Sequence, residues 1–116
     1  MDVYNAWFDL KAGTGDVELA EQVAAYMGHL KAEGLIEAWR LTRRKLGLGA
    51  PGLGEFHLAI EVRDLRQLDD AFERVAARRG PVEVFHFSVN SIVGNAVFAL
   101  YRDFPDAVRH RGEERF

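Results

Sequence analysis

The chain contains no cysteine, which excludes a disulfide framework, thiol catalysis and metal sites held by thiolates. No stretch approaches the roughly 20 consecutive apolar residues that a membrane-spanning helix needs. The first residues also lack a basic segment followed by an apolar one, so no signal peptide is expected. These absences make a cytoplasmic protein the default expectation.

A strong charge of either sign is missing as well. The formal net charge of −3 and the isoelectric point near 5.8 give no overall attraction to nucleic acid or to an anionic membrane. A chain of 116 residues, 48% hydrophobic and 28% charged, is typical of one globular domain with its own core. We therefore expect neither a nucleic-acid partner nor a membrane partner.

Polar and apolar residues alternate cleanly along residues 55–62, as in a strand with one face in a core. Segments rich in β-favouring residues predict further strands, and apolar residues at helical spacing predict helices. In chain order the predicted elements are a strand at 3–10, a helix at 16–33, strands at 35–46 and 55–62, a helix at 64–79 and a strand at 96–102.

Residues 82–93 fit two patterns. As a strand, the segment would align Phe85, Phe87 and Val89, whereas as a helix it gathers its aliphatic residues on one side. We favour a short third helix, because the glycine at position 94 then separates it from the last strand. The glycine-rich residues 47–54 lack a phosphate-loop motif and are predicted to be a flexible loop.

This element order is that of a split βαβ pair, which folds as a four-stranded antiparallel sheet with helices on one face. The predicted class is therefore α+β with a ferredoxin-like fold. We assign residues 1–106 to a single ferredoxin-like domain and residues 107–116 to a charged C-terminal tail. The core between sheet and helices is expected to contain Tyr4, Phe8, Phe56, Leu58, Ile60, Leu65, Leu68, Phe72, Val75, Ala76, Phe98 and Leu100.

The opposite sheet face is also predicted to be rich in apolar side chains, including both tryptophans. Such a patch marks an interaction surface. A second copy of the chain or a single-stranded RNA would cover it, and the acidic residues of this face favour the second copy. The face is expected to carry Val3, Asn5, Trp7, Glu37, Trp39, Leu41, His57, Ala59, Glu61, Val97, Ala99 and Tyr101, with Trp7, Trp39, Leu41, His57 and Tyr101 in a homodimer interface.

Two segments, 56–72 and 97–106, resemble small uncharacterised bacterial proteins. The element order and the apolar second face resemble the dimeric α+β barrel superfamily. It includes antibiotic-biosynthesis-type and haem-degrading monooxygenases, muconolactone isomerase-like enzymes and stress-responsive barrel proteins. The resemblance covers about residues 3–106 and implies a homodimer. The resemblance specifies the fold but not the reaction, because the superfamily has many functions.

Haem-degrading members of the superfamily use an asparagine on the first strand, a tryptophan on the second main helix and a histidine on a later helix. Asn5 and His86 match the first and the last of these by position. The tryptophan has no counterpart, because Phe72 is the only large aromatic residue of the predicted helix at 64–79. The resemblance therefore does not favour haem, and no cofactor is expected.

Cofactor-independent oxygenases of the superfamily hold an aromatic substrate between sheet and helices. This resemblance implies Asn5 and His86 as candidate catalytic residues, with Tyr26, His29 and Asn90 as ligand-binding residues. The leading hypothesis is binding of a small aromatic or hydrophobic metabolite, with cofactor-independent monooxygenase or isomerase activity. The alternative is a non-enzymatic dimeric module, structural or stress-related, in which these polar residues are structural.

His57 stands on the predicted second face with Glu55 and Glu61. A carboxylate–histidine cluster can bind a metal or act as an acid–base pair. A hydrogen-bonded polar patch within an interface is the interpretation that we favour, and no metal site is predicted.

Overall fold

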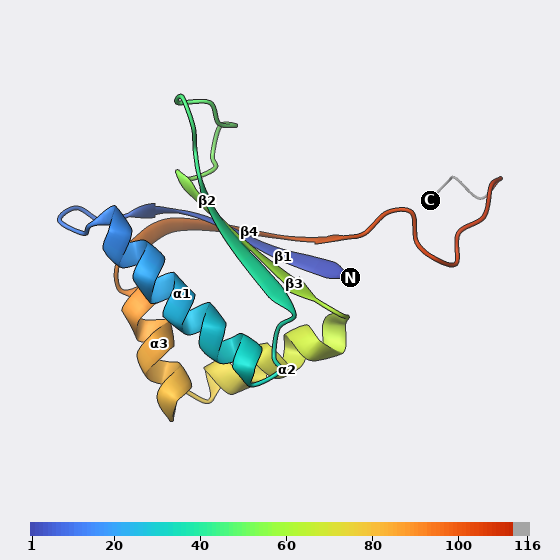
Figure 1. Ribbon diagram of the computed structural model, residues 1–116. Helices are drawn as coiled ribbons and strands as arrows, with labels where there is room; N and C mark the ends of the chain where they lie inside the picture. The colour runs from blue at the N-terminus through green and yellow to red at the C-terminus, as the bar shows by residue number, and fades with distance from the viewer. Residues whose placement is uncertain (113–116) are drawn as a thin grey trace.

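A sheet of four strands lies above three helices in the computed structural model, which describes residues 1–112 (Figure 1). Residues 113–116 of the predicted tail lie outside the described residues. Within residues 1–112, no helix is both long and apolar enough to cross a bilayer. The elements are β1 (Asp2–Leu10), α1 (Asp16–Ala32), β2 (Ala38–Arg43), β3 (Phe56–Val62), α2 (Leu65–Ala76), α3 (Pro81–Asn90) and β4 (Val93–Arg102).

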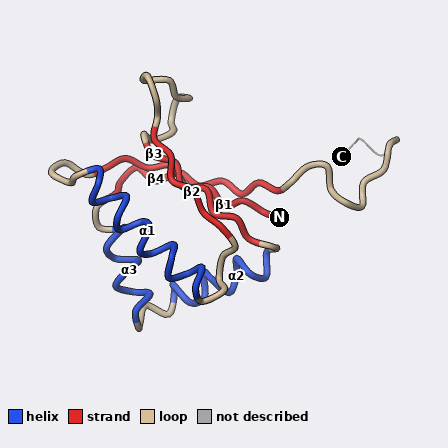
Figure 2. The backbone as a smooth tube through the Cα atoms, viewed as in Figure 1, coloured by secondary structure: helices blue, strands red, loops and turns tan. Residues whose placement is uncertain are grey.

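The strands follow the order β2-β3-β1-β4, and every neighbouring pair is antiparallel. All three helices lie on the same side of the sheet (Figure 2). The predicted ferredoxin-like fold is therefore confirmed. The prediction of a short third helix after position 80 is also confirmed: α3 begins at Pro81, where proline is tolerated in the first helical turn, and ends at Asn90, so that Val93 already belongs to β4.

Local side-chain hydrogen bonds fix where α2 begins. The Asp64 carboxylate accepts from the backbone N–H of Gln67 at 2.9 Å, and the Gln67 side-chain oxygen accepts from the N–H of Arg63 at 2.8 Å. Asp16, the residue at which the sequence predicts the first helix to begin, is the first helical residue of α1 and not its N-cap, which is Gly15. The Asp16 carboxylate accepts a hydrogen bond from Arg43 instead, at 2.9 Å.

The core lies between α1 and the middle strands, β1 and β3. Direct pairing of Tyr4 with Ile60 and of Phe8 with Phe56 places these side chains on the helix side of the sheet. The buried residues are Ala6, Phe8, Leu19, Val23, Met27, Leu30, Leu35, Ile36, Phe56, Leu58, Ile60, Val62, Leu68, Ala71, Val82 and Val89.

The predicted faces of Trp39 and Leu41 are wrong. In β2, Trp39 pairs with Ile60 and Leu41 pairs with Leu58, so both lie on the helix side and pack against the core. Alternation within a strand shows which residues share a face, but it does not show which of the two faces meets the helices. The loop between β2 and β3 decides that register.

Four residues predicted in the core are only partly covered. Phe98 and Leu100 of β4 lie on the helix side of the sheet, yet they remain 58% and 52% exposed. Leu65 and Phe72 of α2 are 59% and 47% exposed. Edge strand β4 thus lacks the helical cover that β1 and β3 have, and one strip of the helix-facing side is open.

Two valines of α1 provide a matched test of this core. Val23 is 1% exposed and Val17 is 66% exposed. Val23→Ala should lower the free energy of unfolding by about 2 kcal/mol, because it removes buried methyl groups and leaves a cavity. Val17→Ala should change it by less than about 0.5 kcal/mol. Urea unfolding of both variants measures the difference, and equal effects would contradict the placement of α1.

Candidate functional site

A cavity of about 300 Å³ lies between the sheet and the helices. Strands β1, β3 and β4 and all three helices contribute to its wall, and most of the wall is apolar. A volume of this size is at the lower end of what small-molecule sites occupy. The lining residues are Tyr4, Ala6, Phe8, Tyr26, Met27, Leu30, Ile36, Leu58, Ile60, Leu68, Ala71, Phe72, Val75, His86, Val89, Asn90, Val93, Ala96 and Phe98.

Polar side chains line this cavity at a few positions. Tyr26 comes from α1, and His86 and Asn90 come from successive turns of α3, while Tyr4 comes from the sheet. The Tyr26 and His86 rings meet edge to face with their centroids 6.0 Å apart. Three of the predicted site residues, Tyr26, His86 and Asn90, are therefore gathered around one cavity.

Burial fixes the protonation state of the two tyrosines. The pKa of Tyr26 is raised to about 12, chiefly by burial and to a smaller extent by the neighbouring Tyr4 and Glu83. Burial also raises the pKa of Tyr4. Both phenols are therefore protonated at neutral pH, so each presents a hydrogen-bond donor rather than a phenolate base.

Glu83 places a carboxylate close to this polar region. It lies one turn before His86 on α3, where residues three apart share a helix face, and its charge acts on Tyr26. Its buried oxygen Oε2 has no hydrogen-bond partner among the described residues. Glu83 does not itself line the cavity, so it acts on the site through the charge that it places near Tyr26.

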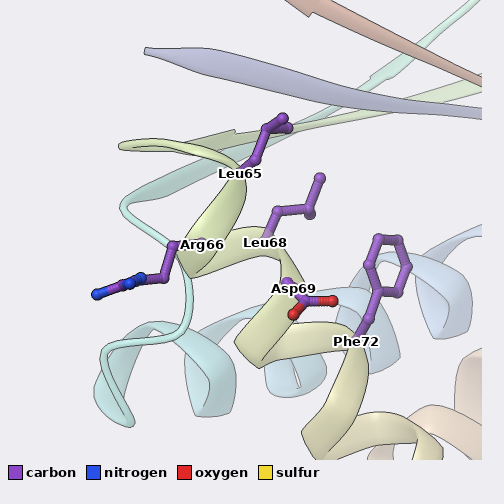
Figure 3. Close-up of a pocket in the computed structure, with 5 residues that line it drawn as sticks. All are labelled: Leu65, Arg66, Leu68, Asp69 and Phe72. Carbon is purple, nitrogen blue, oxygen red and sulfur yellow. The ribbon is translucent and has the colours of Figure 1, made fainter.

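The cavity opens toward α2. Leu68 and Phe72 line the cavity and also line a hollow of about 500 Å³ on this helix (Figure 3). In Figure 3, Leu65, Leu68 and Phe72 extend from α2 on the side of the sheet. The Tyr4 ring contacts Phe72 edge to face at 5.2 Å, so the aromatic wall continues from this opening into the cavity.

Asn5 does not face the cavity. It alternates with Tyr4 and Ala6 along β1 and so lies on the outer face of the sheet, although it is only 7% exposed. Its Oδ1 accepts from His57 Nε2 at 2.8 Å, and its Nδ2 donates to the carbonyl of Val3 at 3.1 Å. The predicted convergence of Asn5 and His86 is therefore wrong, because period-two alternation puts them on opposite sides of the sheet.

The outer face holds a small polar cluster of its own. His57 stacks on Trp7 with ring centroids 4.5 Å apart and an interplanar angle of 7°. The Glu55 carboxylate does not contact His57 here; it accepts a hydrogen bond from Arg43 Nε at 3.0 Å. In the part of the chain that the structure describes, no three histidine or carboxylate side chains are grouped to hold a metal. Asn5, Trp7 and His57 thus form a packed, hydrogen-bonded unit.

His29 lies near the cavity without lining it. Its ring packs on Phe85 of α3 with the centroids 4.9 Å apart. The structure therefore gives His29 a role in the contact between α1 and α3 and not the predicted role of a ligand-binding residue.

Sequence reasoning missed Tyr4 as a polar residue of the cavity wall and Glu83 as a charged neighbour of Tyr26. Tyr4 was assigned to the core on alternation alone, although a buried phenol needs a hydrogen-bond partner. Glu83 had a usable signal, since it stands three residues before His86 and seven before Asn90 on the predicted helix.

A ferredoxin-like sheet, one-sided helices and a largely apolar cavity between them define the structural class of this protein. The chain belongs to a Family of unknown function (DUF6614), which matches residues 1–116. No curated protein matches the sequence.

Several solved structures share the fold. The At3g17210 protein of Arabidopsis thaliana has a TM-score of 0.71 and 10% identity, over 93% of this chain and 100% of that one. A dimeric ferredoxin-like protein of unknown function from Jannaschia sp. CCS1 has a TM-score of 0.64 and 9% identity, over 89% and 100%. SnoaB, a cofactor-independent oxygenase from Streptomyces nogalater, has a TM-score of 0.59 and 12% identity, over 93% and 97%. The resemblance to dimeric ferredoxin-like proteins is thus confirmed for the fold.

The partly buried position of His57 gives a pH-dependent stability. Burial lowers the pKa of its imidazole below the ordinary value of 6.5. The unfolded chain therefore binds a proton more readily than the folded protein does, and stability should fall as pH drops below about 6.5. Urea unfolding at pH 7.5 and 5.5 should show a larger loss in the wild type than in His57→Gln. Equal losses in the two proteins would contradict this assignment.

Proposed function

We propose that the protein binds a small aromatic molecule in the cavity between its sheet and helices. The observation that carries this proposal is the cavity of about 300 Å³, whose wall is apolar apart from Tyr4, Tyr26, His86 and Asn90. Apolar walls with a few polar groups are typical of small-molecule sites, in which burial supplies affinity and polar contacts set the orientation.

The polar groups define the kind of ligand. Protonated phenols at Tyr4 and Tyr26 donate hydrogen bonds to a carbonyl or hydroxyl oxygen. The side-chain amide oxygen of Asn90, which lines the cavity, accepts one from a hydroxyl or an N–H. A hydroxylated aromatic molecule offers both functions, together with a flat apolar body that suits the aromatic wall.

Cofactor-independent oxygenation of the bound molecule is the reaction that we propose to test first. The fold shared with SnoaB supports this choice. Such a reaction needs a base that takes a proton from the substrate, and protonated phenols do not supply one. An imidazole is the commonest general base in proteins. His86, which lines the cavity, is the residue that we propose for this role.

Ligand binding is testable by thermal shift and absorbance. A phenol, naphthol or quinone at 100 times its dissociation constant should stabilise the protein by about 2.7 kcal/mol and so raise Tm by roughly 10 °C. His86→Ala should weaken binding about tenfold, because one hydrogen bond to the ligand is lost. Oxygen uptake with the same compounds then tests for oxygenation.

The matched control for His86→Ala is His29→Ala. Both histidines lie at the contact between α1 and α3 and are half-buried, but only His86 lines the cavity. The control should keep the affinity of the wild type. Equal losses in the two variants would contradict the assigned site. No shift with any compound would favour the non-enzymatic dimeric module.

We also propose that the outer sheet face makes this protein a homodimer. Pairing across the sheet places Val3 beside Tyr101 and Trp7 beside Val97 on this face. Tyr101 is 65% exposed and Val97 is 41% exposed, and a large exposed apolar patch marks an interaction surface. Trp39 and Leu41 do not belong to this proposed interface, because they face the core.

A charge placed at the centre of this face should prevent dimerisation. Trp7→Glu should raise the dimer dissociation constant at least about 30-fold, the effect of losing a central aromatic contact. Leu46→Glu, in a loop position that is 83% exposed, is the control and should leave the dimer intact. Sedimentation equilibrium at micromolar concentration measures the dimer dissociation constant of each variant. A wild-type protein that is monomeric under these conditions would overturn the proposal.

A further inference from the structure

A second apolar surface lies on the helix side of the sheet. It consists of Leu65 and Phe72 of α2 with Phe98 and Leu100 of β4, and we call it the α2–β4 groove. Each of the four side chains is between 47% and 59% exposed. The Tyr4 ring contacts Phe72 at 5.2 Å and Phe98 at 5.8 Å, so the two halves of the groove are continuous.

Edge strand β4 is apolar on both of its faces. Val97 and Tyr101 lie on the outer face, whereas Phe98 and Leu100 lie in the groove. Strands that read as nearly continuous apolar runs are normally covered on both sides. An exposed apolar edge strand promotes aggregation unless something covers it. The dimer proposed above covers the outer face only, which leaves the groove open.

The segment that follows β4 carries two large apolar side chains that are exposed. Residues 103–112 follow β4 and run away from the sheet and the helices (Figures 1 and 2). Within this segment Phe104 is 84% exposed and Val108 is 80% exposed. Two large apolar side chains four residues apart suit a shallow apolar groove.

We propose that the α2–β4 groove of one protomer binds residues 103–112 of a second copy of this chain. Phe104 and Val108 of the second copy would pack against the groove. This segment leaves the end of the sheet in the direction away from its own helices, so it reaches toward a neighbour. In a dimer with two-fold symmetry, each protomer places this segment in the groove of the other, so both grooves are covered and no further copy can add.

The exchange would also complete the ligand site. Phe72 and Phe98 belong both to the groove and to the wall of the cavity. A partner's segment seated in the groove therefore lies across the opening of the cavity beside α2. This consequence rests on the proposed binding function, whereas the docking of the segment does not.

The absence of native cysteine permits a direct test of docking. The doubly substituted chain Leu65→Cys with Val108→Cys should form disulfide-linked dimers under mild oxidation. The control pair is Leu48→Cys with Val108→Cys, since Leu48 is 77% exposed in the loop between β2 and β3. Val108→Cys alone controls for linkage between two tails. Non-reducing electrophoresis separates linked dimers from linked monomers.

Linked dimers formed by the groove pair, well in excess of both controls, would support the proposal. A disulfide within one chain, no linkage, or equal linkage in the controls would overturn it. As a second measurement, Phe104→Ser with Val108→Ser should raise the dimer dissociation constant at least about tenfold with unchanged circular dichroism. An unchanged dissociation constant would also overturn it.

The two proposals fail in distinguishable ways. If the groove pair links but no aromatic compound shifts Tm, the proposed ligand site is wrong and the docking of the segment stands. If aromatic compounds bind to the wild type and to the Phe104→Ser, Val108→Ser chain with equal affinity and the groove pair does not link, the docking is wrong and the ligand site stands.

Discussion

The alternation of side chains along β1 is the constraint on which the rest of the structure depends. β1 lies in the interior of the sheet between β3 and β4, so both of its edges are paired, while one face meets the helices and the other is the outer face of the sheet (Figure 2). Tyr4, Ala6 and Phe8 extend into the cavity, whereas Asn5 and Trp7 extend to the outer face. Residues 4–8 of this strand thereby face either the cavity or the proposed dimer interface.

The helices cover the sheet only in part. This links the open side of the cavity to the exposed apolar surface of α2 and β4. Because β4 lies outside the cover of the helices, Phe98 and Phe72 form an open aromatic wall and not a closed core. That opening would give the proposed ligand access to the cavity, and it also exposes apolar surface that a monomer would leave in water. The two proposals, ligand binding and self-association, therefore rest on the same structural feature of this domain.

Prediction from the sequence succeeded where it relied on a repeating pattern. Helical spacing located α1, α2 and α3, and it correctly placed His86 and Asn90 on one face of α3. Prediction failed where two segments had to be placed relative to each other. The face of Trp39 depended on the register of β2 with β3, and the supposed meeting of Asn5 with His86 ignored the sheet that lies between them.

The sequence by itself determined the elements, their order and the fold class, because periodicity and turn residues act over a few positions. It also identified Tyr26, His86 and Asn90 as side chains able to serve one site. Only the tertiary structure decided that Asn5 bonds His57 on the far face, that Glu83 lies close to Tyr26, and that Phe72 and Phe98 stay exposed. These facts depend on how far the helices extend across the sheet, and no short-range pattern records that distance.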